Sequence, residues 1–104
     1  MKINEFQEEC LRTINNSGKA LIIECALGIT GEAGEVADDV KKWQGQGHWL
    51  NEEHIIEELG DVAYYIAVMA AALNTNLETV LKRNVEKRKK RYPNGFESER
   101  SINR

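Results

Sequence analysis

The sequence predicts an all-α protein, a four-helix bundle with a short extended C-terminal tail. Apolar residues recur every three or four positions along almost the whole chain, and no useful run alternates apolar with polar residues. Polar clusters of Asn, Ser and Gly, and a single proline, divide this pattern into four stretches. The chain has 104 residues, the size of one domain, so residues 1–104 are treated as a single domain.

The first helix is predicted close to the start of the sequence. Asn4 and Gln7 resemble a capping box that opens this helix. Its apolar positions are Ile3, Phe6, Cys10 and Ile14. The Asn-Asn-Ser-Gly sequence at residues 15–18 is typical of the turn that ends it.

The second helix is predicted over residues 20–43. One apolar stripe follows it from end to end and consists of Ile22, Ala26, Ile29, Ala33, Val36, Val40 and Trp43. The helix also contains Gly28, Gly31 and Gly34, and each glycine costs up to about 1 kcal/mol inside a helix. We therefore expect another helix or a ligand to approach the backbone closely here. Residues 44–51 break the pattern and form a loop.

The third and fourth helices are predicted over residues 52–73 and 77–91. Asn51 is the expected N-cap of the third helix. Its apolar residues are Ile55, Leu59, Val62, Ile66, Met69 and Leu73. Thr75 and Glu78 form a second capping box before the fourth helix, which the following Tyr-Pro-Asn-Gly sequence ends. The last dozen residues are expected to form the extended tail.

Charge is distributed unevenly, although the net charge is only −3. Ten acidic residues lie between positions 24 and 61, where only two lysines oppose them, and nine of the 14 basic residues lie from position 82 onwards. An acidic middle beside a basic end suits a site that holds cations and polyanions together, but two solvated helix faces would have the same composition. The net charge is negative and no groove-reading motif is present, so no nucleic-acid partner is predicted.

The sequence predicts a cytoplasmic protein with no membrane partner. Its longest uncharged apolar-rich stretch, residues 62–77, is shorter than the roughly 20 residues that a spanning helix needs. The N-terminal sequence lacks the apolar region of a signal peptide. Cys10 and Cys25 form no CxxC motif and pair with no histidine in the sequence, so we expect buried thiols and no zinc site.

Two pairs of acidic residues stand three positions apart on neighbouring predicted helices. Glu32 and Glu35 project from one side of the second helix, and Glu58 and Asp61 from one side of the third. If these helices pack antiparallel, the four carboxylates converge and repel one another unless a cation neutralises them. Oxygen ligands alone suit Mg²⁺ or Mn²⁺. The alternative is a surface stripe of acids beside a glycine-lined packing face.

The residues around these pairs resemble the MazG-like nucleotide pyrophosphohydrolases. The first block, from residue 28, reads Gly-Ile-Thr-Gly-Glu-Ala-Gly-Glu-Val-Ala-Asp, and the second, from residue 57, reads Glu-Glu-Leu-Gly-Asp-Val-Ala-Tyr-Tyr. They contain the ExxE and ExxD pairs of that family. The closing segment is also similar, with Asn84, Lys87, Arg-Tyr-Pro from residue 91 and Gly-Phe from residue 95. The likeness covers roughly residues 20–96 and implies the all-α NTP pyrophosphatase fold.

The resemblance implies Mg²⁺-dependent hydrolysis of nucleoside triphosphates to the monophosphate and pyrophosphate, usually with dNTPs or damaged nucleotides as substrates. It implies that Glu32, Glu35, Glu58 and Asp61 bind Mg²⁺, for which Mn²⁺ can substitute. A carboxylate not fully engaged by metal would orient or deprotonate the attacking water, and Glu35 is our choice. Glu35 and Glu58 are thus the catalytic candidates, and no histidine base is required.

Candidates for substrate contact come from the last two helices. Asn84 and Lys87 can reach phosphates as a neutral donor and a point charge, and the resemblance also favours Arg91 and Tyr92. Tyr65 lies one turn beyond Asp61, on the stripe that also carries His54 and Glu58. There it either binds the nucleotide or fills the core.

One tryptophan precedes the loop between the second and third helices, and another lies within it. Trp43 ends the apolar stripe, which favours the core or a subunit interface, with stacking on a nucleobase of the substrate as the alternative. His48 and Trp49 lie in a glycine-flanked segment, where an exposed aromatic is a candidate lid over a ligand.

Two other functions stay open at this level. Phosphoribosyl-ATP pyrophosphohydrolases have related acidic helices, but the Gly-Glu-Ala-Gly-Glu block and the Arg-Tyr-Pro ending fit them less well. A non-catalytic helical module that binds a nucleotide or protein is the second alternative, and the four intact acids argue against it. The resemblance also implies a homodimer or homotetramer, since small family members typically complete their sites between subunits. Apolar residues 62–73 agree with burial on more than one side.

Overall fold

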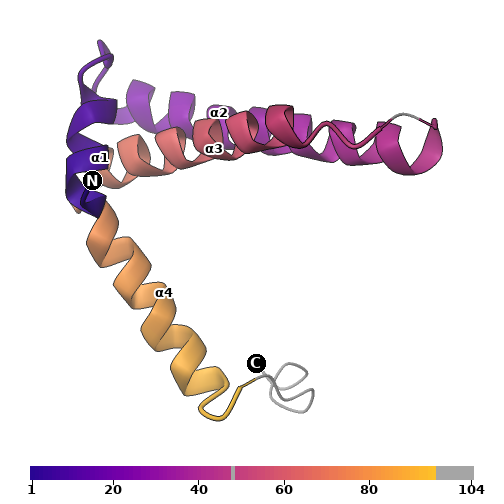
Figure 1. The fold of residues 1–104 in the computed structure, drawn as a ribbon. Coiled ribbons are helices and arrows are strands. Elements are labelled where there is room, and N and C mark those ends of the chain that lie inside the picture. Colours follow the sequence, from indigo (N-terminus) through magenta and orange to yellow (C-terminus); the bar gives the residue numbers. More distant parts are fainter. Residues whose placement is uncertain (48, 96–104) are drawn as a thin grey trace.

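A computed structural model of the chain contains four α-helices (Figure 1). It describes residues 1–47 and 49–95, and these ranges contain no β-strand. The helices are α1 (Ile3–Leu11), α2 (Gly18–Gly45), α3 (Glu52–Ala72) and α4 (Leu77–Arg91). The all-α class and its four helices are confirmed. The predicted tail beyond residue 95, including Phe96, and the lid residue His48 lie outside the described residues.

The helices α2 and α3 run antiparallel along most of their length and form one long arm (Figure 1). Helix α1 packs against α3 at one end of this arm. Helix α4 starts at the same end, contacts α1 and α3 there, and then diverges from the arm, so that the arm and α4 form the two limbs of a V (Figure 1). The four helices thus meet at a junction at this end of the arm, from which α4 diverges.

A small hydrophobic core fills this junction. Its buried members are Cys10, Leu21, Cys25, Ala67, Val68 and Leu77. Both cysteines are free and buried, as predicted. No helix in the described residues has both the length and the apolar composition that crossing a membrane requires.

The predicted helix caps are only partly correct. Asn51 caps α3 as expected, because its Oδ1 accepts a hydrogen bond of 3.1 Å from the His54 amide. At α4 the cap is Asn76, whose Oδ1 accepts from the Thr79 amide at 2.8 Å, so the predicted box of Thr75 and Glu78 is wrong. The box of Asn4 and Gln7 is also wrong, because the N-cap of α1 is Lys2, two residues before Asn4.

Asn4 and Gln7 instead connect α1 to the start of α4. The buried Gln7 side chain donates through Nε2 to the carbonyl oxygen of Ala67 at 3.0 Å and accepts through Oε1 from the Leu77 amide at 3.2 Å. Asn4 Oδ1 accepts from the Glu78 amide at 3.1 Å. Two of the amides that a helix N-terminus leaves without internal partners are thus satisfied by α1, which holds the base of α4 in place.

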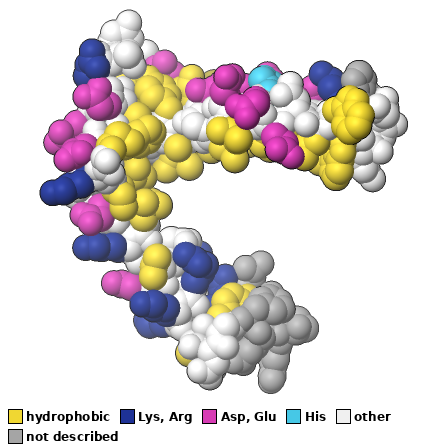
Figure 2. Space-filling model, in the orientation of Figure 1, with side chains coloured by type: hydrophobic (Ala, Val, Ile, Leu, Met, Phe, Trp, Pro, Cys, Tyr) yellow, Lys and Arg dark blue, Asp and Glu magenta, His cyan; other side chains and the backbone are white. Residues whose placement is uncertain are grey.

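The apolar stripes of α2 and α3 lie on one flank of the arm, which we call the apolar flank. Residues that face the opposite helix, such as Asp39 and His54, are each followed by a stripe residue, here Val40 and Ile55. Along an α-helix, the side chain of the next residue is rotated by about 100° around the helix axis. In two antiparallel helices this rotation turns away from the shared contact toward the same side, so Val40 and Ile55 lie on one flank. Stripe residues that stay exposed include Val40 at 41%, Trp43 at 49% and Leu59 at 55%. Figure 2 shows hydrophobic side chains along the edge of the arm that faces α4.

Candidate active site

The two acidic pairs meet between α2 and α3. Glu32, Glu58 and Asp61 each place a carboxylate oxygen within 4.8 Å of the others, and Glu35 forms a second such group with Glu58 and His54. The antiparallel packing explains this convergence, because each pair spans one turn and lies opposite the other. Figure 2 shows acidic side chains gathered over the middle of the arm. The four predicted carboxylates therefore form one cluster, which we call the carboxylate cluster.

Glu58 lies at the centre of the carboxylate cluster and belongs to both groups. It is only 8% exposed, and its Oε2 atom has no hydrogen-bond partner among the described residues. The neighbouring Glu32 carboxylate, together with burial, raises the pKa of Glu58 to about 7. Two carboxylates in such contact cannot both be ionised at low cost, so they either share a proton or need a cation between them.

His54 and Asp39 extend the carboxylate cluster, although sequence reasoning gave neither of them a role. The His54 ring lies between two carboxylates, with Nδ1 hydrogen-bonded to Asp39 Oδ2 and Nε2 3.2 Å from Glu58 Oε1. The hydrogen bond with Asp39 is the main cause that raises the pKa of His54. The sequence spacing could have identified both residues. His54 stands four residues before Glu58, and Asp39 stands four residues after Glu35, so each lies on the same helix face as a predicted carboxylate.

Tyr65 closes the side of the carboxylate cluster next to Glu32. Its ring packs directly on Gly28, where an added Cβ would lie 2.5 Å from Tyr65 Cε1. The close approach expected at the three glycines of α2 thus occurs at Gly28, where the Tyr65 ring contacts the backbone. A Cβ added at Gly31 or Gly34 would meet nothing within 4 Å. Burial, followed by the charge of Glu32, raises the pKa of Tyr65. Tyr65 is partly buried beside the acids, which agrees with both roles considered for it.

The α4 candidates are not brought to the carboxylate cluster within one chain, because α4 extends away from the arm (Figure 1). Asn84 Oδ1 accepts a hydrogen bond of 2.8 Å from Arg88 Nε. Lys87 is exposed, whereas Arg91 and Tyr92 are half-buried. The substrate contacts predicted for Asn84, Lys87, Arg91 and Tyr92 stay predictions.

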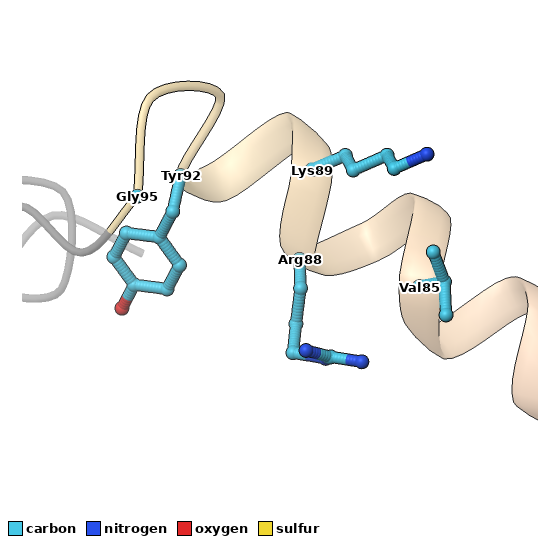
Figure 3. A pocket seen from close by; sticks show the side chains of 5 residues that line it. All are labelled: Val85, Arg88, Lys89, Tyr92 and Gly95. Atoms are coloured by element: carbon cyan, nitrogen blue, oxygen red, sulfur yellow. The ribbon is translucent and has the colours of Figure 1, made fainter.

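A surface hollow of about 320 Å³ lies at the C-terminal end of α4. Val85, Arg88, Lys89, Tyr92 and Gly95 line it, and the side chains of Arg88 and Tyr92 extend from the same side of the helix (Figure 3). At the opposite end of the molecule, Trp43 and Trp49 are 49% and 92% exposed. Trp43 is therefore outside the core of this chain, while the interface and stacking roles both remain predictions.

The chemistry of the carboxylate cluster fits a divalent cation. Three carboxylates supply oxygen ligands of the kind that Mg²⁺ and Mn²⁺ prefer, and the buried Glu58 Oε2 has no partner among the described residues. A cation there would remove both the mutual repulsion of the acids and the cost of an unpaired buried oxygen.

Comparison with known proteins identifies the family of the chain. Residues 21–96 match the sequence profile of the MazG nucleotide pyrophosphohydrolase domain. The chain is 40% identical over 73 residues to the Gene 37 protein of Mycobacterium phage L5, an alignment that covers 66% of this chain and 64% of that protein. The chain thus spans less than two-thirds of the length of this curated relative. No solved structure matches the chain significantly.

Proposed function

The chain belongs to the MazG nucleotide pyrophosphohydrolase family, and from that premise we propose that it hydrolyses nucleoside triphosphates in a Mg²⁺-dependent reaction. The products are the nucleoside monophosphate and pyrophosphate, and the substrates are dNTPs or non-canonical NTPs. The observation that carries this proposal is the convergence of Glu32, Glu58 and Asp61 within 4.8 Å, with a buried Glu58 oxygen left unpaired.

In this proposal Glu32, Glu35, Glu58 and Asp61 hold Mg²⁺, and Mn²⁺ can take its place. When bound, the cation neutralises phosphate charge and polarises the α-phosphorus. Glu35 is the exposed member of the first pair, so it can reach a water molecule from solvent, orient it and accept its proton. The water oxygen bonds to the α-phosphorus, the bond from that phosphorus to the bridging oxygen breaks, and pyrophosphate leaves.

A second copy of the chain completes the site in this proposal. The apolar flank leaves large side chains exposed, and contiguous exposed apolar surface is typical of an interface. The basic α4 and the acidic arm are complementary in charge, yet they diverge within one chain (Figure 1). A homodimer or homotetramer would cover the apolar flank and allow Asn84, Lys87, Arg91 and Tyr92 of one copy to approach the substrate held by another.

The first experiment is product analysis with purified protein, Mg²⁺ and a panel of canonical and modified NTPs and dNTPs. Glu58→Gln keeps the size of the side chain but removes the charge that a cation needs, so we expect turnover to fall by about a hundredfold or more. Glu57→Gln is the matched control, because Glu57 is the exposed neighbour and lies outside the carboxylate cluster. It should retain activity close to that of the wild type.

The products separate the possible reactions. Monophosphate plus pyrophosphate, lost in Glu58→Gln only, supports the proposal and ranks the substrates. Diphosphate plus orthophosphate would keep an enzyme but exclude cleavage at the α-phosphorus. If no nucleotide is turned over, phosphoribosyl-ATP becomes the next substrate to test. A chain whose melting temperature does not rise with Mg²⁺ would instead fit the non-catalytic binding module.

A further inference from the structure

The His54 ring is held in a geometry that proteins use to present an imidazole to a metal ion. Its Nδ1 atom is hydrogen-bonded to Asp39, whose side chain is only 12% exposed, while its Nε2 atom points toward the carboxylate cluster. Histidines that bind metals commonly donate one ring N–H to a carboxylate, which fixes the tautomer and leaves the other nitrogen free to coordinate. Asp39 is placed to fix His54 in this way.

The surroundings of Nε2 supply further ligands. A ring nitrogen of His54 and carboxylate oxygens of Glu35 and Glu58 lie within 4.8 Å of one another, and Nε2 is 3.2 Å from Glu58 Oε1. The contact between His54 and Glu58 uses Oε1 and leaves the buried Oε2 without a partner. An ion pair with His54 alone therefore leaves one oxygen of Glu58 without a partner among the described residues, and Glu58 belongs to both groups of possible ligands.

We propose that Glu35, Glu58 and His54 Nε2 form a second cation position, distinct from the all-oxygen group of Glu32, Glu58 and Asp61, with Asp39 as a positioning residue and Glu58 shared between the two. Its nitrogen ligand favours a first-row transition ion over Mg²⁺, with Co²⁺ bound more tightly than Mn²⁺, because the affinity of nitrogen-containing sites rises along that series. This inference rests on the proposed function, since both use Glu35 and Glu58.

The test detects the nitrogen ligand directly and needs no nucleotide. The untagged full chain is loaded with Mn²⁺ alone, and pulsed electron paramagnetic resonance is used to look for the ¹⁴N coupling of a coordinated imidazole. The chain has two histidines, so His48→Gln and His54→Gln assign the signal. We expect the coupling in the wild type and in His48→Gln, and its loss in His54→Gln.

Calorimetric titration of Mn²⁺ gives a second measure. Asp39→Asn should weaken Mn²⁺ binding by roughly tenfold to a hundredfold, the usual effect of losing the partner that supports a ligand, and His54→Gln should weaken it at least as much. Asp38→Asn is the matched control, because Asp38 is the next residue and forms an exposed ion pair of 3.0 Å with Lys42. Circular dichroism melting of each variant identifies any that fail to fold, and the wild-type spectrum does not depend on them.

The outcomes separate this inference from the proposed function. Mn²⁺ bound to the wild type without ¹⁴N coupling, or coupling that survives His54→Gln, overturns the second position even if nucleotides are hydrolysed. Coupling that depends on His54 supports it even if no nucleotide is turned over, and in that case the proposed reaction alone fails.

Discussion

Glu58 carries the largest electrostatic cost of the carboxylate cluster in the metal-free chain. It is nearly buried, it lies against Glu32, and its Oε2 is unpaired among the described residues. His54 offsets only part of this cost, since its positive charge lowers the pKa of Glu58 while Glu32 and burial raise it. The carboxylate cluster thus lowers the stability of the metal-free protein, and a cation bound there would offset this cost.

This arrangement predicts how stability depends on pH without metal. The pKa of Glu58 is raised from 4.5 to about 7 on folding, so between these values the folded state binds a proton that the unfolded state has released. Folding also raises the pKa of His54 above its ordinary value of 6.5. Protonated His54 therefore contributes its full stabilisation below pH 6.5 and loses it as the pH rises through the pKa of the folded state. We therefore expect the free energy of unfolding, measured with urea and a chelator, to fall as pH rises from 6 to 8.

Glu58→Gln is the control for this dependence, because its side chain does not titrate. The decline between pH 6 and 8 should become shallower in this variant, with the part due to His54 remaining. Saturating Mg²⁺ should offset the decline in the wild type, because the cation binds the ionised carboxylates. A metal-free wild type whose stability rises over this range would contradict the charge arrangement described for Glu58 and Glu32.

The glycines of α2 show that one residue type has different roles along one helix. Replacing a helical glycine with alanine usually stabilises a protein by up to about 1 kcal/mol. Gly31 has open space around its missing side chain, so Gly31→Ala should give that gain in a urea titration. At Gly28 the new methyl group would meet the Tyr65 ring, and Gly28→Ala should instead cost about 1–3 kcal/mol through overpacking. A loss of stability in Gly31→Ala would indicate that another copy packs on this glycine.

The helices themselves could largely be predicted from the sequence, because apolar periodicity and the N-cap residue Asn51 depend on local structure. The bounds of α4 agree fully, and α2 is two residues longer at each end than predicted. Asn4 and Gln7 were misread because capping is not their only use. Their amides bond to backbone groups more than 50 positions away, which local spacing does not encode.

The candidate site was predictable to a similar degree and for the same reason. Three-residue spacing correctly places each acidic pair on one face, and the short loop makes α2 and α3 antiparallel, so their convergence follows. The roles of Asp39 and His54 depend on which residues face each other across the two helices. That register becomes visible only once the helices are packed, when His54 meets Asp39 and Glu58.

At the scale of the whole molecule, the open arrangement leaves large side chains of the apolar flank exposed within residues 1–47 and 49–95. Leu59 on this flank and Ile56 on another side of α3 are 55% and 61% exposed, so both tolerate a charge equally well in an isolated chain. We expect Leu59→Arg to dissociate the proposed oligomer in sedimentation velocity, because it would bury a charge in an apolar interface. Ile56→Arg should leave the sedimentation coefficient unchanged. Equal behaviour of the two variants would exclude the apolar flank as the interface.

The divergence of α4 from the arm leads to a prediction about shared sites. If the carboxylate cluster of one copy is served by α4 of another, Glu58→Gln and Lys87→Glu inactivate different halves of the same site. In a mixed dimer, one site then carries both substitutions and the other carries neither. The two variants, each inactive alone, are unfolded together and refolded as an equal mixture. The mixture should regain about one quarter of wild-type activity, because half of the dimers are mixed and half of the sites in those dimers are intact. If α4 instead folds back onto its own arm, every site keeps one substitution and the mixture stays inactive, so the assay distinguishes a site shared between copies from one built by a single chain.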